Sequence, residues 1–581
     1  MKKRVVLTLL ALFGWGVYRF RRHIVSRLLK LPPPQYDVEV ERAIPVTMPD
    51  GVRLFTDHYY PQGGGDFPTI LIRTPYGRGK EAALFGGYPL SEMPAQRFAE
   101  RGYHVILQGA RGCLDSEGIF SPHINEAPDG QATAAWIEKQ PWFNGSLGTW
   151  GPSYLGYMQW AVAAGKPASL KAMVPIVTSA ENFSVTHPEG AFGLETRLRW
   201  SQGMHVMNKN HGRPFREMVN DRFFGDQEDK LQAAFDQRPL LQADEVAAGE
   251  EIPLFRDILS HDRADDPFWT ERDHSKAVAG VTSAVHLIGG WYDYYLRGIL
   301  RDYATLKASG QSPYLTIGPW NHANPAGMMT GLREGITWFE AQLKGADSGL
   351  RDKPVRLFVM GTEEWREFDS FPPATHKTRF YLHAGHELSM EMPDVDSSPD
   401  NYRYDPADPT PSVGGAILGA DNAGAQDNQE LEARSDVLTY RSFPLSEPME
   451  IIGPVRLILY FRSTLDDTDF FGRLCDVDEN GRSLNICDGL FRVTPGRGES
   501  QTDGSLRIEI ALWPTAHCFQ PGHRLRLQVS SGAHPRWSRN LGRGKKIATA
   551  FEMAAANQTI YHDAAHPSSL TLPVITINNS K

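Results

Sequence analysis

The stretch Leu147-Gly-Thr-Trp-Gly-Pro-Ser-Tyr-Leu-Gly156 decides the fold of this chain. Strand-forming residues lead into a serine flanked by glycines, and an apolar helix-forming run, Tyr154–Ala164, follows it. Such a strand-turn-helix element holds a serine hydroxyl at the sheet edge, and the N–H of the next residue points to the same spot. Gly151 and Gly156 suit this crowded turn because they lack a Cβ. Ser153 is therefore the candidate nucleophile.

The acid and the base of a triad follow in the chain order Ser, Asp, His that an α/β-hydrolase sheet imposes. Ala284-Val-His-Leu-Ile-Gly-Gly-Trp-Tyr-Asp293 and Tyr314-Leu-Thr-Ile-Gly-Pro-Trp-Asn-His322 are each predicted to be a short buried strand that ends at a polar residue. Taken singly, Asp293 is a strand-end cap and His322 a loop histidine. Together they indicate a triad in which the imidazole takes the serine proton and the carboxylate fixes the imidazole tautomer.

Further motifs lie in the same order over nearly all of the chain after residue 40. They are Met48-Pro-Asp-Gly-Val-Arg-Leu54, Arg73-Thr-Pro-Tyr-Gly77, Gln108–Gly118, Gly151–Gly156, Gly290–Asp293, Gly318–His322, Asp467–Asp469, Asp476–Gly481 and Arg524–Ser531, with Pro535 and Arg539-Asn540 beyond them. On these motifs the chain resembles the cocaine-esterase-like (CocE/NonD) hydrolases, which are related to X-Pro dipeptidyl-peptidases and α-amino acid ester hydrolases.

The resemblance implies roles for five residues. Ser153, Asp293 and His322 match the nucleophile, the acid and the base of the family. Tyr76 matches a tyrosine whose hydroxyl helps the N–H of Tyr154 to bind the oxyanion, and no metal or organic cofactor is implied.

The chain departs from the family pattern at Gly109, where relatives commonly carry Asp. We expect the neighbouring loop to be held differently there, and Arg111 in that loop to be structural.

Composition favours a large multidomain enzyme. A chain of 581 residues exceeds what one hydrophobic core usually serves. The formal charge of −9 is modest for this size and argues against nucleic acid as a partner. The four cysteines have no zinc-binding spacing, and buried free thiols are favoured over a Cys475–Cys487 disulfide.

The fold class is predicted to be α/β, an α/β-hydrolase core with two additions. Strands alternate with helices over residues 36–180 and 276–373, and a helical cap is expected over 181–275, where the strand pattern stops. Alternating segments predict a β-sandwich over 374–581, and the family implies a jelly roll.

Residues 1–35 form a basic and apolar leader that ends in three prolines. Its uncharged core of 14 residues, 5–18, is short for a membrane-spanning helix, and no small-residue cleavage site follows. The apolar stripe continues past basic residues, as in an interfacial helix. We favour an uncleaved membrane anchor, with an atypical signal peptide and a cytoplasmic or secreted protein as alternatives.

These observations predict a serine hydrolase that cleaves a small acyl ester, or less readily an amide, through an acyl-enzyme. X-Pro dipeptidyl-peptidase or α-amino acid ester hydrolase activity, and a binding protein on an inactive scaffold, are the alternatives. Phe192, Trp200 and Met204 are candidate pocket residues, although their helical spacing also suits a core. Because Tyr294, Tyr295, Leu296 and Arg297 follow Asp293, one obvious source of a carboxylate for a substrate ammonium is absent. Uncharged acyl esters are therefore favoured as substrates, while the cap still offers acids for that task, for instance Glu181, Glu189 or Glu195. The oligomeric state stays open.

Overall fold

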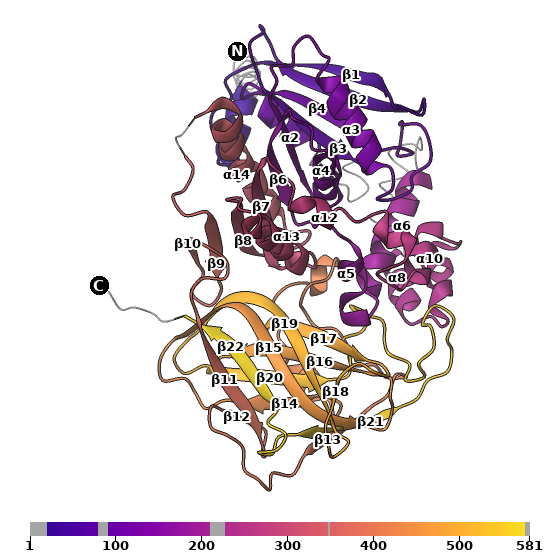
Figure 1. Cartoon of the computed structure of the whole chain (residues 1–581), viewed down its shortest axis with the longest axis vertical. Helices are drawn as coiled ribbons and strands as arrows, with labels where there is room; N and C mark the ends of the chain where they lie inside the picture. Colours follow the sequence, from indigo (N-terminus) through magenta and orange to yellow (C-terminus); the bar gives the residue numbers. More distant parts are fainter. Residues whose placement is uncertain (1–19, 80–90, 210–226, 347–348, 576–581) are drawn as a thin grey trace, which may run out of the picture. The chain divides into compact units, whose positions relative to one another are not determined.

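The computed structural model describes residues 20–79, 91–209, 227–346 and 349–575, and its chain divides into two compact units (Figure 1). The first unit consists of Met1–Ile176, Gly280–His286 and Pro325–Leu350. The second consists of Val177–Ala279, Leu287–Asn324 and Arg351–Lys581. Both the segment expected as a cap and the C-terminal region thus belong to the second unit.

The first unit is built on a mainly parallel sheet with the strand order β1-β2-β4-β3-β5-β6. Strands β1 and β2 are antiparallel, as are β2 and β4, whereas β4, β3, β5 and β6 run parallel. The strands are β1 (Val38–Thr47), β2 (Arg53–Pro61), β3 (Thr69–Thr74), β4 (His104–Gly109), β5 (Leu147–Pro152) and β6 (Leu170–Ile176). Every residue of β3, β4 and β5 is buried, as expected for central strands covered on both faces.

Four helices of the first unit pack around this sheet: α2 (Glu92–Ala99), α3 (Glu126–Ile137), α4 (Tyr154–Ala164) and α14 (Pro325–Lys344). Helix α4 contacts β3, β5 and β6, and all of its residues except Ala164 are buried. A helix that is apolar on every side belongs in the interior, which agrees with the run of residues after Ser153.

The second unit contains the strands that precede the expected acid and base. Its α/β elements are the last six residues of β7 (Ala284–Tyr292), α13 (Leu296–Ala308), β8 (Tyr314–Asn321), β9 (Val355–Val359) and β10 (Glu364–Phe368), with the strand order β7-β8-β9-β10. Strand β9 is parallel to β8 and antiparallel to β10. Asp293 directly follows β7, and His322 directly follows β8.

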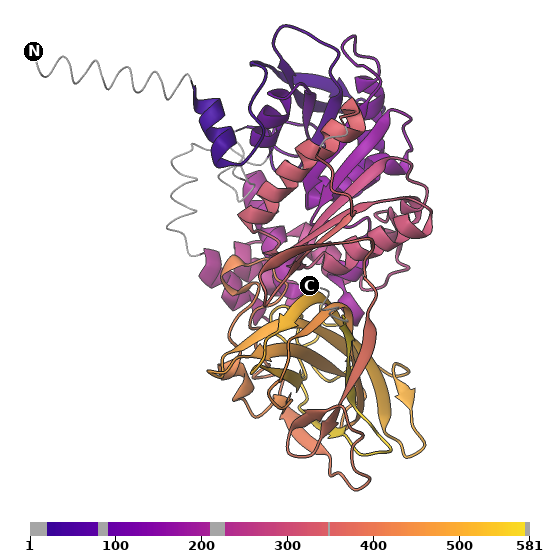
Figure 2. The ribbon, with the colours of Figure 1, turned by 90° about the vertical axis from the view of Figure 1, so that its left-hand side faces the viewer.

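Helices make up the regular structure between β6 and β7, as far as that segment is described (Figure 2). They are α5 (Phe183–Thr186), η2 (Pro188–Gly190), α6 (Leu194–Lys209), α8 (Gln227–Phe235), η3 (Leu240–Gln242), α9 (Ala243–Ala248), α10 (Pro253–Ser260), α11 (Pro267–Thr270) and α12 (Ser275–Val278). They have an apolar core of their own, in which Phe192, Phe255 and Trp269 are among the largest side chains.

The C-terminal region is β-rich, and twelve strands form its sheet. The strands are β11 (His376–His383), β12 (Glu387–Ser389), β13 (Asp400–Tyr404), β14 (Leu438–Arg441), β15 (Met449–Ser463), β16 (Thr468–Val477), β17 (Ser483–Val493), β18 (Glu499–Ser500), β19 (Leu506–Phe519), β20 (Arg524–Ser530), β21 (Ala556–Tyr561) and β22 (Ser569–Val574), with η4 (Ala420–Asn422) and α15 (Gln429–Glu432) between them. All four cysteines of the chain are buried and free, so the expected absence of a disulfide is confirmed.

Residues 1–19, the larger part of the expected leader, lie outside the described residues. Residues 20–28 are helical. Within the described ranges, no helix is both long and apolar enough to cross a bilayer.

Candidate active site

Ser153 lies at a sharp turn between β5 and α4, with backbone angles φ 55° and ψ −122°. Its N–H donates to the carbonyl of Ile176 at 2.8 Å, and its own carbonyl accepts from the N–H groups of Gly156 and Tyr157 at 2.9 and 3.0 Å. A non-glycine residue with these angles costs about 1–3 kcal/mol, and such strain concentrates at functional sites. The backbone thus has the sharp strand-to-helix turn that the sequence predicts at Ser153.

Gly151 makes this turn possible. A Cβ at this position would lie 2.4 Å from the Cβ of Leu155, which belongs to the first turn of α4. Since real Cβ atoms do not approach one another so closely, the strand can turn into the helix only with glycine here.

Tyr76 follows β3 in the same unit. Its N–H donates to Thr74 Oγ1 at 3.1 Å, and its side chain is half-buried. Tyr154, whose N–H is the second expected oxyanion donor, is buried at the start of α4. The first unit therefore holds the expected nucleophile, Ser153, and both expected donors.

A polar network that the sequence did not reveal lies around Tyr154. The Tyr154 hydroxyl donates to the carboxyl group of Glu126 and accepts from the N–H of His123 at 2.8 Å. The His123 ring also packs on the Tyr154 ring, with 4.5 Å between centroids. Glu126 is buried at the start of α3, and desolvation raises the pKa of its carboxyl group.

Asp293 and His322, the expected acid and base, meet in the second unit. His322 Nδ1 and Asp293 Oδ2 are 2.7 Å apart, and both side chains are buried. The N–H of Tyr295 donates to Asp293 Oδ1 at 2.7 Å, which holds the carboxylate from its other side. The Tyr294 ring stacks on the imidazole at 4.3 Å between centroids. The carboxylate and the stacked ring together fix the orientation of His322.

Gly290 explains how the two strand ends can lie so close. A Cβ on Gly290 would lie 2.2 Å from the carbonyl oxygen of Trp320, so β7 and β8 approach at a distance that only glycine permits. The glycines that the sequence shows before Asp293 therefore have a structural reason.

Tyr295 is a neighbour of the acid and the base that sequence reasoning did not single out. Its hydroxyl donates to Asn182 Oδ1 at 3.1 Å, and its ring lies 5.8 Å from that of His322. Asn182 precedes α5, so a residue of the segment expected as a cap contacts the loop that carries Asp293. The sequence carries no spacing signal for this pair, because 113 positions separate the two residues.

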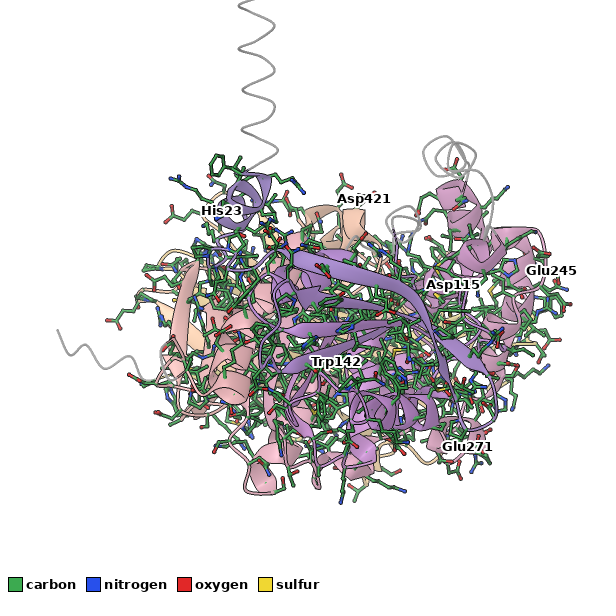
Figure 3. The ribbon with its side chains drawn as sticks, turned by 90° about the horizontal axis from the view of Figure 1, so that it is seen from above. His23, Asp115, Trp142, Glu245, Glu271 and Asp421 are labelled. Atoms are coloured by element: carbon green, nitrogen blue, oxygen red, sulfur yellow. The ribbon has the colours of Figure 1, made fainter. Side chains whose placement is uncertain are left out.

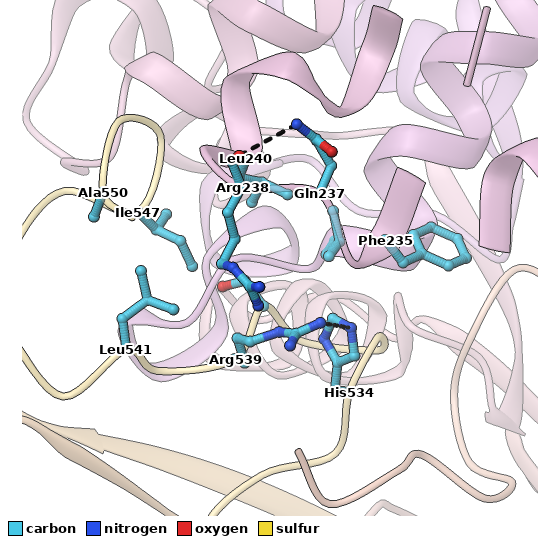
Figure 4. Close-up of a pocket in the computed structure, with 11 residues that line it drawn as sticks. Phe235, Gln237, Arg238, Leu240, His534, Arg539, Leu541, Ile547 and Ala550 are labelled. Carbon is cyan, nitrogen blue, oxygen red and sulfur yellow. Dashed lines mark hydrogen bonds between the residues drawn. The ribbon is translucent and has the colours of Figure 1, made fainter. Parts of the chain in front are cut away.

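Two of the three candidate pocket residues, Phe192 and Trp200, belong to the apolar core of the cap helices, and Met204 is buried. Phe192 also lines a cavity of about 390 Å³ in the second unit, together with Asp467, Arg492 and Lys546. A smaller cavity of about 20 Å³ lies nearby, where His534 and Arg539 are joined at 3.0 Å (Figure 4). No member of the expected triad lines either cavity.

Two of the cap acids are paired with cations. Glu181 accepts from the N–H and the hydroxyl of Ser184 at 2.5 and 2.6 Å and lies 2.8 Å from Arg301. Glu189 lies 2.7 Å from Arg297. Each carboxylate thus already has a counter-charge.

The third cap acid, Glu195, is buried and accepts four hydrogen bonds, one of them from the Thr196 hydroxyl at 3.2 Å. Arg199 Nε donates to it at 2.6 Å, and the N–H groups of Leu418 and Gly419 donate at 3.0 and 2.9 Å. Its carboxylate thus ties α6 to the C-terminal region.

The loop after β4 is held without an aspartate at Gly109. The Ser116 hydroxyl donates to the Gly109 carbonyl at 3.2 Å, and a Cβ on Gly109 would lie 2.9 Å from that hydroxyl oxygen. Arg111 pairs with Asp50 and Asp129, each at 2.6 Å. Within the described residues, no cluster of three or more His, Cys, Asp or Glu side chains is arranged to hold a metal ion.

Comparison with known proteins gives the family. Residues 50–324 match the family described as X-Pro dipeptidyl-peptidase (S15 family), and residues 349–571 match the X-Pro dipeptidyl-peptidase C-terminal non-catalytic domain. The chain is 33% identical to cocaine esterase of Rhodococcus sp. (strain MB1 Bresler), over 91% of this chain and 97% of that protein.

Two solved structures share the fold. An aminopeptidase from a marine sediment archaeon, Thaumarchaeota archaeon, superimposes with a TM-score of 0.79 at 22% identity, and an α-amino acid ester hydrolase with 0.75 at 23%. Each alignment covers 93% of this chain and 97% of the other. The fold is thus an α/β hydrolase with a β-rich C-terminal domain, and the chain belongs to the cocaine-esterase-like (CocE/NonD) family of serine hydrolases.

Proposed function

We propose that Ser153 is the nucleophile of this serine hydrolase and that it cleaves a small acyl ester through an acyl-enzyme. The observation that carries the proposal is the strained backbone of Ser153 at the junction of β5 and α4. The Ser153 Oγ attacks the ester carbonyl, an Oγ–C bond forms, and the alcohol leaves. Water then attacks the acyl group and releases the carboxylic acid and the free serine.

His322 is the proposed base and Asp293 its partner. With Nδ1 facing the Asp293 carboxylate, Nε2 is the nitrogen that takes the serine proton and returns it to the leaving alcohol. The carboxylate stabilises the imidazolium that forms in this step. The hydrogen bond from the Tyr295 N–H keeps the carboxylate in place throughout.

The Tyr76 hydroxyl and the Tyr154 N–H are the proposed oxyanion donors. A donor that is held rigidly stabilises negative charge that develops only in the transition state. The expected role of Tyr76 is supported by its position two residues after β3, on the carboxyl-end edge where Ser153 also follows β5.

We propose that the acyl group carries no α-ammonium. Burying a cation without a counter-charge is costly, so enzymes that accept amino-acyl groups need a carboxylate for it. The residues after Asp293 supply none, and Glu181, Glu189 and Glu195 already accept from other groups. This arrangement favours the simple esterase over the amino-ester and X-Pro dipeptidyl-peptidase alternatives.

A substrate panel on the purified full-length chain tests both proposals. Methyl 3-phenylpropanoate and phenylalanine methyl ester differ only in the α-amino group, and we expect a higher kcat/KM for the former. Nitrophenyl butyrate, cocaine and an X-Pro nitroanilide complete the panel, and a fluorophosphonate probe should label Ser153. A preference for the amino ester or the anilide would contradict the simple esterase, and labelling elsewhere would contradict the nucleophile.

We further propose that residues 1–35 attach the enzyme to a membrane surface. The supporting observation is the face of the helix over residues 20–28, where Phe20, Ile24 and Leu28 are 57%, 41% and 75% exposed. They are spaced i, i+4, i+8, and basic side chains surround them. The opposite face carries Ser26, whose hydroxyl accepts from Arg101 Nη2 at 3.0 Å. His23 marks this helix in Figure 3.

Sedimentation with phosphatidylserine vesicles tests this attachment. We expect the full-length chain to pellet with the vesicles, and a chain without residues 1–35 to stay in the supernatant with its esterase activity intact. Leu28→Ser should weaken binding, whereas Ser463→Ala, on the β-rich domain, should not. If the full-length chain stays in the supernatant, residues 1–35 do not attach the enzyme to such a membrane and the proposal is wrong.

A further inference from the structure

We infer that Glu126 is a positioning residue for the oxyanion donors of the proposed site: its side chain holds Tyr154, and its main-chain carbonyl holds the strand that leads to Tyr76. The inference rests on the proposed function, because it assigns a role relative to Tyr76 and Tyr154. Glu126 touches neither donor atom itself. It contacts the side chain of one donor residue and an arginine in the strand that leads to the other.

The first contact fixes Tyr154. Its hydroxyl donates to the Glu126 carboxyl group, and its ring packs between this contact and His123. The Tyr154 N–H begins α4, so a side chain that is fixed at its far end limits rotation of the first helical turn. The direction of the N–H then depends on Glu126 as well as on the turn at Ser153.

The second contact fixes the strand before Tyr76. Arg73 Nη1 donates to the main-chain carbonyl of Glu126 at 2.8 Å, and Arg73 Nε donates to Gln108 at 2.9 Å. Arg73 is buried, and a Cβ on Gly130 would lie 2.9 Å from its Nη1, so glycine leaves room for the guanidinium. Tyr76 follows three residues later. Both donors are thus tied to the first residue of α3.

The burial of Glu126 argues for a role beyond packing. One carboxyl oxygen, Oε2, has no hydrogen-bond partner and is inaccessible to solvent. Burying a carboxyl oxygen without a hydrogen-bond partner destabilises the folded protein, and an apolar side chain of similar volume would avoid this cost. Retaining the acid is explained if its hydrogen bond to Tyr154 serves the oxyanion site.

The test compares Glu126→Leu, Glu126→Gln and Tyr154→Phe with the wild-type chain on nitrophenyl butyrate. Loss of one oxyanion donor costs about 10²–10³ in kcat, so a misaligned donor should cost at least about tenfold, with KM changed by less than about twofold. Glu126→Gln keeps an acceptor for the Tyr154 hydroxyl and should recover activity to within about threefold of wild type.

A boronic acid separates positioning from general destabilisation. It forms a tetrahedral adduct in which Ser153 Oγ binds boron, and a boron-bound oxygen occupies the oxyanion site. Its Ki should rise in Glu126→Leu by about the factor by which kcat falls. Tyr103→Phe is the matched control, because the Tyr103 hydroxyl donates to Glu340 at 2.9 Å in the same unit and contacts neither donor segment.

Non-additivity provides the last criterion. Glu126→Leu and Tyr154→Phe remove the same hydrogen bond. The kcat of the double variant should therefore be at most about twofold below that of the slower single variant. Folded single variants with wild-type kcat and boronate Ki, or losses that multiply in the double variant, would overturn the inference. Tyr154→Phe provides the criterion if Glu126→Leu does not fold. A wild-type chain that neither hydrolyses esters nor reacts with the fluorophosphonate would overturn the proposed function, and this inference with it.

Discussion

Ser153 is positioned by its own backbone, whereas Asp293 and His322 are positioned by contacts between side chains. At the first position, a left-handed φ and the missing Cβ of Gly151 create the turn within five residues. At the second, a carboxylate, an imidazole and the Tyr294 ring from two separate strand ends hold one another. The turn at Ser153 is strained. The contacts among Asp293, His322 and Tyr294 depend on the presence of every partner. The two halves of the site should therefore respond differently to substitution.

The largest effect should follow from Ser153→Ala. We expect kcat to fall by roughly 10⁴–10⁶ while the protein stays folded, since a triad acts as a unit. Ser153→Gly should be equally inactive but about 1 kcal/mol more stable than Ser153→Ala, because glycine adopts φ 55° without cost. Ester turnover and thermal unfolding of the two variants measure this. A folded Ser153→Ala variant that still turns over the ester would show that Ser153 is not the nucleophile. Equal stabilities of Ser153→Ala and Ser153→Gly would show that the backbone at this position is not strained.

Asp293→Asn should have the next largest effect. It preserves shape but removes the charge that steadies the imidazolium, and we expect a fall in kcat of about 10³–10⁴. The matched control is Glu334→Gln, which neutralises another histidine–carboxylate pair, His286 Nε2 to Glu334 Oε2 at 2.9 Å. That control should keep kcat within about twofold. Comparable losses in both variants would show that the effect is not specific to the acid.

Residues of this site that belong to local motifs could be predicted from the sequence, and residues with distant partners could not. Ser153, Asp293 and His322 were proposed from short motifs that end in glycines, and the turn at Ser153 and the Asp293–His322 contact agree with them. Glu126 and Tyr295 were missed, because their partners lie 28 and 113 positions away and no local pattern marks such pairs. The sequence therefore predicts side chains that end local motifs, but it does not predict distant partners that no motif marks.

The same limit applies to the cap. The sequence left Glu195 available as a counter-charge for a substrate ammonium. The structure instead pairs it with two backbone amides more than 220 positions away. The helices between β6 and β7 were expected because the strand pattern stops there, and the strands of the core were expected because their apolar runs are local.

Tyr76→Phe probes the donor side with a smaller change. Removing one hydroxyl should lower kcat by about 10²–10³ with a smaller effect on KM, because the hydrogen bond forms mainly in the transition state. Steady-state kinetics on nitrophenyl butyrate measure kcat and KM separately. Tyr303→Phe is a suitable control, since the Tyr303 hydroxyl accepts a 3.3 Å hydrogen bond from the Phe371 N–H, in the other unit. An unchanged kcat in Tyr76→Phe would remove Tyr76 from the site.

The smallest effect concerns acid stability, and it separates a catalytic histidine from a structural pair. His58 Nε2 and His104 Nδ1 are 2.9 Å apart in the first unit, and Trp142 packs on both rings (labelled in Figure 3). Burial lowers the pKa of His58 to about 3 and that of His104 to about 4, and for His58 the neighbouring His104 lowers it further.

Both pKa values lie below the unfolded value of about 6.5, so the unfolded chain binds protons first as the pH falls. The stability that the neutral pair provides is complete above pH 6.5 and declines towards pH 3–4, by up to about 1.4 kcal/mol per pH unit for each histidine. His58→Gln removes one titrating group, so its melting temperature should fall less steeply between pH 6.5 and 4.5 than that of the wild type. The value of kcat at pH 7 should be the same in both proteins, because the residues of the proposed site are unchanged. An equally steep fall of the melting temperature in both proteins would show that the pair does not bind protons on unfolding, and a lower kcat in His58→Gln would show that the pair is coupled to the proposed site.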